Sequence, residues 1–185
     1  MRLSDVRKHL RRKIVPMENI FSLLSGLDFK SVLDVGAGTG LFLEEMRARR
    51  PQLRMVGVET NNRYCRADTG ICIVGPEALT EKEKFDLILF MDVLHHNYDK
   101  ATLLNYYISR HLADKGHVFI KEMSPEKQLC KYYNRLHDLL MFQERIYEIS
   151  LSTLVEFLQP KLRLVSHTSR RIFLYDHYMV LLQSA

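Results

Sequence analysis

A glycine-rich turn between an apolar strand and a helix constrains the fold of this chain more than any other feature. Residues 31–40 read Ser-Val-Leu-Asp-Val-Gly-Ala-Gly-Thr-Gly, so glycine occupies every second position from 36 to 40. The apolar run before the glycines predicts a buried parallel strand, and the sequence after them predicts a helix over 39–49. Glycine lets the backbone turn sharply and approach a ligand where a Cβ atom would collide. The pattern therefore predicts a nucleotide-type ligand site where this strand ends.

Two common glycine-rich sites do not fit the spacing. A dinucleotide fingerprint needs glycine or alanine at the last position of G-x-G-x-x-G/A, and here that position is Leu41 or Leu43. A P-loop would close on Gly-Lys-Ser or Gly-Lys-Thr, whereas Gly40 is followed by leucine. What remains is D-x-G-x-G-x-G after a strand, followed by a second strand over 53–58 that ends on Glu59. An acid at that place can accept hydrogen bonds from both hydroxyls of a ribose.

At these residues the chain resembles the class I S-adenosylmethionine-dependent methyltransferases. Their first motif is similar to residues 32–40, and their ribose-binding acid corresponds to Glu59. Residues 85–96, Phe-Asp-Leu-Ile-Leu-Phe-Met-Asp-Val-Leu-His-His, look like the family's fourth strand and the loop after it, in the variant D-V-L-H-H. Residues 116–122, Gly-His-Val-Phe-Ile-Lys-Glu, look like its fifth strand. The resemblance covers residues 29–123.

The resemblance implies an α/β fold with a doubly wound, mostly parallel seven-stranded sheet and an antiparallel C-terminal strand. A chain of 185 residues that is 46% hydrophobic can bury one sizeable core and is too short for two ordinary domains. We expect N-terminal helices over 1–27, a cofactor-binding core over 29–123, and acceptor-side helices with a final strand pair over 124–185. The connection 61–70 is shorter than the helical crossover usual in the family. We expect that helix to shrink to a turn and to expose part of the cofactor site.

The resemblance also implies S-adenosylmethionine as cofactor and S-adenosylhomocysteine as product. Asp34 and the glycine turn would hold the methionine part, Glu59 the ribose, and the Asp92 region the methyl-transfer face. Many relatives carry an adenine-contacting acid at the end of the third strand, and here the acid comes later, as Glu77. The expected cofactor-binding residues are Asp34, Gly36, Ala37, Gly38, Gly40, Glu59, Glu77, Met91 and Asp92.

The chemistry implied is displacement at a methyl carbon held on a positively charged sulfur. Such a leaving group is already activated, so the protein mainly has to align the acceptor and exclude water. For a hydroxyl acceptor, a positioned base would add roughly 10²–10⁴-fold. His95 and His96 are the first candidates, since histidine titrates near neutral pH; one of two adjacent histidines in this loop commonly has a structural role instead. His137, on a helix predicted to begin at Ser124, is a further candidate, with a place at the margin of the core as its alternative.

The loop after the fourth strand constrains the acceptor. Enzymes that methylate base amino groups carry a Pro-Pro-Tyr-like turn there, whereas D-V-L-H-H looks more like small-molecule and lipid- or quinone-pathway O- and C-methyltransferases. An apolar acceptor pocket, or plain core, would suit Met123, Tyr132, Tyr133, Met141, Phe142 and Tyr147. We therefore expect O- or C-methylation of a small, apolar or carrier-bound acceptor. An RNA or protein methyltransferase and a non-catalytic S-adenosylmethionine-binding module remain as alternatives.

The charge of the chain is concentrated at its N-terminus. The formal net charge is +5, and residues 1–13 contain six basic residues and one acidic residue, so they carry all of the excess. Apolar residues at near-helical spacing predict a basic amphipathic helix before Pro16. The helix could pack on the domain with a solvated basic face, or dock on an acidic partner, an anionic membrane or nucleic acid. An Arg-rich, acid-poor start also resembles a mitochondrial presequence.

Other features of the sequence predict a cytoplasmic protein. The longest apolar runs are far below the length of a membrane span, and the charged start has no apolar core like that of a secretory signal. The cysteines at 65, 72 and 130 lack Cys-x-x-Cys spacing. A disulfide framework or a zinc site is therefore not expected, and no metal ligands are assigned.

Overall fold

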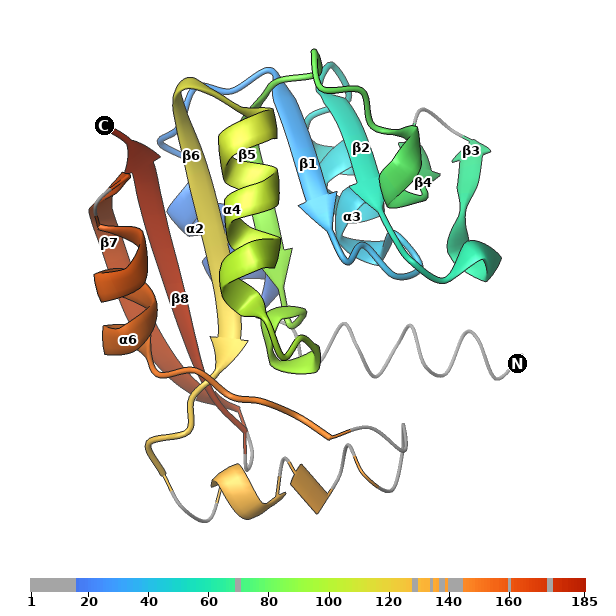
Figure 1. Ribbon diagram of the computed structural model, residues 1–185. Coiled ribbons are helices and arrows are strands. Elements are labelled where there is room, and N and C mark those ends of the chain that lie inside the picture. The colour runs from blue at the N-terminus through green and yellow to red at the C-terminus, as the bar shows by residue number, and fades with distance from the viewer. Residues whose placement is uncertain are drawn as a thin grey trace.

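An eight-stranded sheet, counted over the described residues, forms the centre of the fold (Figure 1). The computed structural model describes residues 16–68, 71–127, 130–133, 135–136, 139, 145–159, 161–172 and 175–185. The strands are β1 (Ser31–Val35), β2 (Arg54–Val58), β3 (Arg66–Asp68), β4 (Ile71–Val74), β5 (Phe85–Met91), β6 (Leu112–Met123), β7 (Leu162–Ile172) and β8 (Tyr175–Ser184). The α-helices are α2 (Met17–Leu24), α3 (Leu41–Arg49), α4 (Lys100–His111) and α6 (Leu151–Leu158). One-turn 3₁₀ helices are η1 (Asn62–Tyr64), η2 (Pro76–Ala78) and η3 (Leu94–His96).

The strand order, β3-β4-β2-β1-β5-β6-β8-β7, reverses direction between β1 and β5. Neighbours from β4 to β6 are parallel, whereas β3 pairs antiparallel with β4, and β8 pairs antiparallel with both β6 and β7. This order confirms the predicted doubly wound, mostly parallel α/β fold with an antiparallel C-terminal strand. In such sheets, ligands bind beyond the carboxyl ends of the strands at the point of reversal.

The sequence predicts seven strands, and β3 is an additional one. The connection after β2 is too short for a crossover helix, as expected, and it forms η1 and then the short edge strand. The side chain of Asn61 caps η1 by accepting a hydrogen bond from the N–H of Arg63 at 3.2 Å. β3 then pairs with β4, with Ala67 opposite Cys72. Sequence alone did not reveal this strand because three residues are too few to show a period.

Helices cover both faces of the sheet (Figure 1). One hydrophobic cluster joins α4 and α6 to the sheet, and a second cluster joins α2 and α3 to its other face. Along β6, Val118 and Ile120 belong to the first cluster and Phe119 to the second. Because side chains alternate along a strand, the next two residues, Lys121 and Glu122, point to opposite faces. The buried end of β6 therefore presents one charged side chain to each layer.

Several predicted boundaries shift for identifiable reasons. The helix predicted over 39–49 begins at Leu41, because Gly40 caps it in a left-handed conformation with φ of 77°. β7 is longer than predicted, and β8 begins later than the predicted final strand, because Ile172 ends β7, opposite Tyr175, instead of starting the final strand. Residues 125–127 form bends, so a helix does not begin at Ser124; described helical residues resume at 130.

Some predictions fall on residues that the structure does not describe. These are the basic helix over 1–13, His137, and the candidate acceptor-pocket residues Met141 and Phe142. Among the described residues, no helix has both the length and the apolar character that crossing a membrane requires.

Candidate functional site

The carboxyl ends of the parallel strands bring the sequence-predicted site residues to one edge of the sheet. The glycine turn follows β1, Glu59 follows β2, Glu77 follows β4, and Asp92 follows β5. β6 ends beside β5, with Met91 in register with Lys121. Segments that are far apart in the sequence thus meet at the edge where sheets of this kind bind ligands.

The glycine turn is held by the end of β2. The N–H groups of Gly36 and Ala37 donate to the carbonyl of Val58 at 2.8 and 3.0 Å. The N–H of Gly38 donates to Oε2 of Glu59 at 2.8 Å, and the N–H of Asn61 donates to Oε1 at 3.0 Å. An ionised carboxylate has about four acceptor positions, so Glu59 retains capacity for ligand hydroxyls. The turn between β1 and α3 is partly exposed, and the carboxylate of Glu59, expected from the sequence to bind a ribose, lies beside it.

Gly36→Ala is expected to lower the free energy of unfolding by about 2 kcal/mol, because residue 36 has φ of 76° and a left-handed alanine is strained. A Cβ atom there would also lie 2.5 Å from Cγ2 of Val93, in the loop after β5. Urea unfolding measures the loss. Gly26→Ala is the control, since a Cβ atom at that position has no heavy atom within 4 Å. Equal stability of the two variants would contradict the assigned strain.

Asp34 and Glu77 occupy different environments. Asp34 is buried within β1, in register with Gly57 and Leu89. Glu77 is exposed on η2, and its carboxylate folds back over Gly75, where Oε1 would lie 2.1 Å from an added Cβ atom. The two acids therefore lie at different depths, one inside the sheet and one on the surface beside β4.

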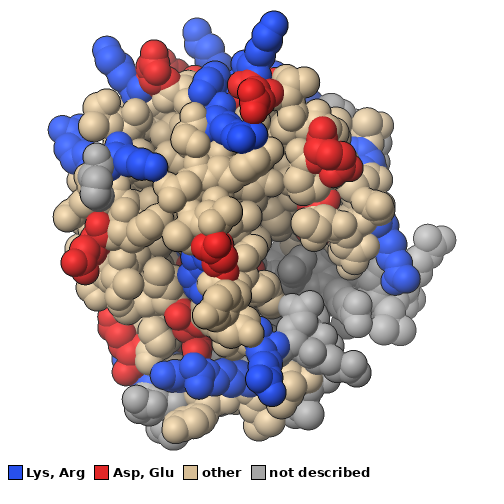
Figure 2. All heavy atoms as spheres, in the orientation of Figure 1, with Lys and Arg blue, Asp and Glu red and all other residues tan. Residues whose placement is uncertain are grey.

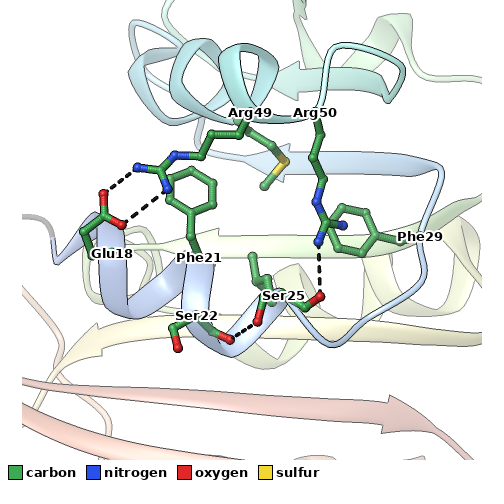
Figure 3. Close-up of a pocket in the computed structure, with 9 residues that line it drawn as sticks. Glu18, Phe21, Ser22, Ser25, Phe29, Arg49 and Arg50 are labelled. Atoms are coloured by element: carbon green, nitrogen blue, oxygen red, sulfur yellow. Dashed lines mark hydrogen bonds and ion pairs between the residues drawn. The ribbon is translucent and has the colours of Figure 1, made fainter.

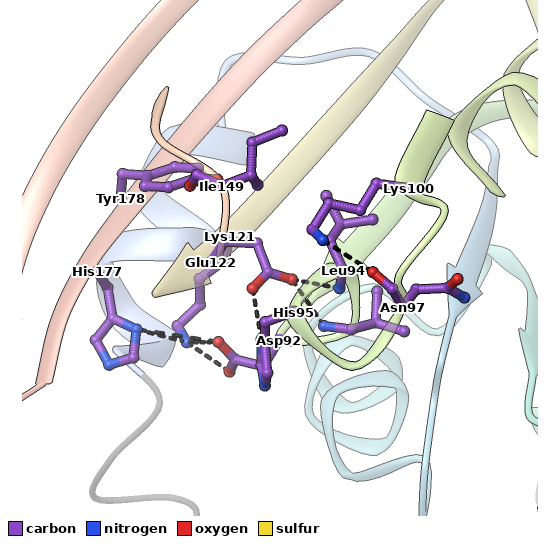
Figure 4. A network of polar contacts seen from close by, with 11 residues as sticks. Asp92, Leu94, His95, Asn97, Lys100, Lys121, Glu122, Ile149, His177 and Tyr178 are labelled. Carbon is purple, nitrogen blue, oxygen red and sulfur yellow. Dashed lines mark hydrogen bonds and ion pairs between the residues drawn. The ribbon is translucent and has the colours of Figure 1, made fainter. Parts of the chain in front are cut away.

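The loop after β5 is fixed on one side by a buried ammonium (Figure 4). Asp92 has φ of 54°, and its N–H donates to the carbonyl of Lys121 at 2.8 Å. Lys121 is 0% exposed, and its Nζ donates to both carboxylate oxygens of Asp92, at 2.6 and 2.5 Å. The same Nζ lies 3.4 Å from Nδ1 of His177 on β8. Burial raises the pKa of the Asp92 carboxyl, but the positive charge and hydrogen bond of Lys121, together with the nearby His177 and His95, lower it overall.

The other side of the loop is fixed by a buried carboxylate. Oε1 of Glu122 accepts from the N–H groups of Val93 and Leu94 at 2.8 and 2.6 Å. Oε2 lies 2.6 Å from Nδ1 of His95, whose side chain is nearly fully buried. His96 is exposed, and its ring centroid lies 4.1 Å from that of His95. The two adjacent histidines are therefore in different environments, as the sequence allowed.

Residues 121–124 were expected at this edge from the sequence, but no role was predicted for Lys121, Glu122 or His177. The sequence did contain one signal, two adjacent charged residues at the end of an otherwise apolar strand. Charged side chains are buried only when they are paired, so this pattern indicates that each has a partner of opposite charge. Their partners are not visible in the sequence, since Asp92 and His95 precede them by 29 and 27 residues.

Aromatic side chains lie beside the loop that follows β5. Tyr98 is 81% exposed and packs edge-on against Tyr147, with ring centroids 5.3 Å apart. The N–H of Tyr147 donates to the carbonyl of His95 at 2.7 Å, and Nζ of Lys100 lies 5.7 Å from the centroid of its ring. Of the other residues expected at an acceptor pocket, Met123 is buried, and Tyr132 and Tyr133 are exposed.

A separate pocket of about 320 Å³ lies between α2 and α3, next to the amino end of β1 (Figure 3). Arg49 stacks over the ring of Phe21 and forms an ion pair with Glu18, and Arg50 stacks over the ring of Phe29. The contacts of Arg49 join the two helices, at the opposite end of β1 from the glycine turn. Within the described residues, no group of three or more His, Cys, Asp or Glu side chains could hold a metal ion.

Comparisons with known proteins agree with this geometry. A family described as a methyltransferase domain matches residues 6–160. A search of the curated proteins found no match. Among solved structures, one similar protein is the N-methyltransferase NodS from Bradyrhizobium japonicum WM9, in complex with S-adenosyl-L-homocysteine. Its sequence is 17% identical, and the two structures match with a TM-score of 0.65 over 91% of this chain and 88% of NodS.

Two further solved structures are similar. Magnesium protoporphyrin IX methyltransferase (ChlM) from Synechocystis PCC 6803, with bound S-adenosylhomocysteine, is 12% identical with a TM-score of 0.69, over 100% of this chain and 89% of ChlM. The plantazolicin methyltransferase BpumL, in complex with a pentazolic desmethylPZN analogue and S-adenosylhomocysteine, is 11% identical with a TM-score of 0.71, over 98% of this chain and 90% of BpumL. The chain therefore belongs to the methyltransferase-domain family, and its fold is that of the class I S-adenosylmethionine-dependent methyltransferases.

Proposed function

We propose that this protein transfers the methyl group of S-adenosylmethionine to oxygen or carbon of a small, apolar or carrier-bound acceptor. The observation that carries the proposal is the meeting of three features at one edge of the sheet. These features are the glycine turn with Glu59, the loop Asp92–His96 held from both faces, and the exposed aromatic pair of Tyr98 and Tyr147 beside that loop.

The proposed cofactor site extends from Glu59 to Asp92. Glu59 would accept the ribose hydroxyls, and Asp34 and the glycine turn would hold the methionine part. Met91 and Asp92 would line the methyl-transfer face. Glu77 is assigned to the adenine, since η2 follows β4, the strand that pairs with β2. The cofactor supplies an activated methyl group, so these residues need only orient it and keep water away.

The acceptor assignment rests on the surroundings of the loop. Tyr98 and Tyr147 offer exposed aromatic surface next to His95, which suits an apolar acceptor. The relatives are named for N-methylation, for a magnesium porphyrin and for plantazolicin, so the shared fold does not select the acceptor. On the face shown in Figure 2, basic side chains lie among acidic ones. Over its described residues, this face therefore offers no continuous basic surface for a polyanion.

Glu59→Ala is expected to weaken S-adenosylmethionine binding by about 1.5–3 kcal/mol, because it removes a charged acceptor from the ribose. Calorimetric titration measures the change. Glu81→Ala is the control: Glu81 is an exposed acid paired with Arg110 on the surface. Wild-type affinity in the Glu59 variant would overturn the ribose assignment.

The first test of the function is calorimetric titration of the purified chain with S-adenosylmethionine and S-adenosylhomocysteine, beside NAD and ATP. We expect saturable micromolar binding of the first pair alone. Incubation with S-adenosylmethionine, substituted phenols and fatty acids, free and as pantetheine thioesters, then identifies the acceptor by the gain of one CH₂ in product mass. Failure of a well-folded sample to bind the first pair would contradict the proposal.

A further inference from the structure

Glu122 is the most heavily engaged acidic side chain at the proposed methyl-transfer face. It is 1% exposed, and both of its oxygens are used within the loop that follows β5. Oε1 accepts from two backbone N–H groups, those of Val93 and Leu94, and Oε2 faces Nδ1 of His95 (Figure 4). One side chain thus fixes both the backbone of this loop and the orientation of an imidazole ring.

These contacts determine where the proton of the imidazole lies. Oε1 of Glu122 faces two N–H donors and must therefore act as an acceptor. An ionised carboxylate has no hydrogen to donate, so in the bond at 2.6 Å the donor is Nδ1 of His95. A neutral imidazole that carries its hydrogen on Nδ1 has its lone pair on Nε2. Glu122 therefore selects the Nδ1–H tautomer.

We propose that Glu122 is a positioning residue for methyl transfer, which fixes His95 with Nε2 as the nitrogen that accepts the proton of the acceptor group. This inference rests on the proposed function and deepens it. It assigns the base role to His95 over His96, because the ring of His95 is fixed by a buried charged hydrogen bond, whereas His96 is exposed. The N–H of Tyr147 on the carbonyl of His95 adds a further constraint from the acceptor side.

With a hydroxyl acceptor, methyl transfer and proton transfer take place in one step. The acceptor oxygen gives its proton to Nε2 of His95 while its lone pair forms the new bond to the methyl carbon. The carbon–sulfur bond breaks, and its electron pair stays on sulfur. The carboxylate of Glu122 stabilises the resulting imidazolium, which then releases the proton to water.

Glu122→Gln tests the inference sharply, because the loop dictates how the new amide is oriented. The N–H groups of Val93 and Leu94 require the carbonyl oxygen of the glutamine on their side. The amide NH₂ then faces Nδ1 of His95, which must become an acceptor, so the hydrogen of the ring moves to Nε2. The substitution keeps the shape of the side chain and its bonds to the backbone while reversing the tautomer.

The experiment combines a spectroscopic and a kinetic measurement. Long-range ¹H–¹⁵N spectra of histidine-labelled protein should show Nδ1–H for His95 in the wild type and Nε2–H in Glu122→Gln. Turnover of a hydroxyl acceptor should fall at least about 100-fold, with KM for the acceptor and affinity for S-adenosylmethionine changed less than about threefold. The acidic limb of the pH–rate profile, where protonation of the imidazole removes the base, should be lost.

Asp86→Asn is the matched control. Asp86 lies at the other end of β5, where its Oδ2 accepts from the N–H groups of Lys30 and Ser31. The Asp86→Asn variant reports the general effect of removing a carboxylate that binds backbone amides. Its turnover should stay near that of the wild type. An Nε2–H tautomer of His95 in the wild type would overturn the inference, and this result does not depend on whether Glu122→Gln folds. Wild-type turnover in a folded Glu122→Gln variant would overturn it as well. The tautomer is read without an acceptor, so failure of the proposed function, seen as absent cofactor binding, is distinguished from failure of this inference.

Discussion

Asp92→Asn is expected to lower the free energy of unfolding by about 3 kcal/mol, one of the largest effects of any single substitution at this site. The substitution leaves the ammonium of Lys121, which is 0% exposed, without the carboxylate that accepts two of its hydrogen bonds. Asparagine tolerates the left-handed backbone conformation of residue 92, so strain does not add to the loss. Urea unfolding at neutral pH measures the change.

A double-mutant cycle separates the ion pair from other effects. Lys121→Met alone should cost less than Asp92→Asn, because the Asp92 side chain is 34% exposed and water can reach it. Combining Asp92→Asn with Lys121→Met removes both charges and should recover most of the stability that Asp92→Asn loses. Additive losses in the double variant would show that the pair does not act as a unit.

The strands that carry the proposed cofactor site could be predicted from the sequence because each is an apolar run next to a distinctive turn. Val32–Val35 leads into alternating glycines, and the run before Asp92 is continuous enough to indicate a strand buried on both faces. Glu59 was placed at a strand end because the apolar run over 53–58 stops there. The local sequence therefore predicts that the glycine turn, Glu59 and Asp92 lie at the carboxyl ends of their strands, and the structure has them there.

Partnerships across the sheet could not be predicted in the same way. Lys121 and Glu122 are adjacent in the sequence, yet they serve opposite faces, and their partners were set by the register of β5 against β6. His177 reaches Lys121 only because β8 returns antiparallel beside β6, 56 residues later. Electrostatic partners of this kind depend on topology, whereas turns and buried strands depend on local sequence. That difference explains why the residues at the carboxyl edge could be placed from the sequence, whereas the contacts that hold the loop could not.

The free energy of unfolding is expected to fall by about 3 kcal/mol as the pH drops from 7 to 4, because His177 cannot easily be protonated in the folded protein. Burial and the nearby positive charge of Lys121 lower the pKa of His177 from 6.5 to about 4, although Asp92 and Asp176 act in the opposite direction. Between these two values the unfolded chain binds a proton on this ring and the folded chain does not. Stability from this group is therefore complete above pH 6.5 and decreases as the pH falls towards 4. Urea unfolding at half-unit pH intervals measures the slope.

His177→Gln should flatten this dependence, since glutamine cannot titrate yet can still accept a hydrogen bond from Lys121. His167→Gln, an exposed histidine on β7, should keep the wild-type slope and serves as the control. The lowered pKa of the Asp92 carboxyl adds a further loss, but only at more acidic pH, below the ordinary aspartate value of 3.8. The two groups are therefore separable by their pH windows. A wild-type curve that is flat from pH 6.5 to 4, or a His177→Gln variant that keeps the slope, would show that His177 is not held neutral by its surroundings.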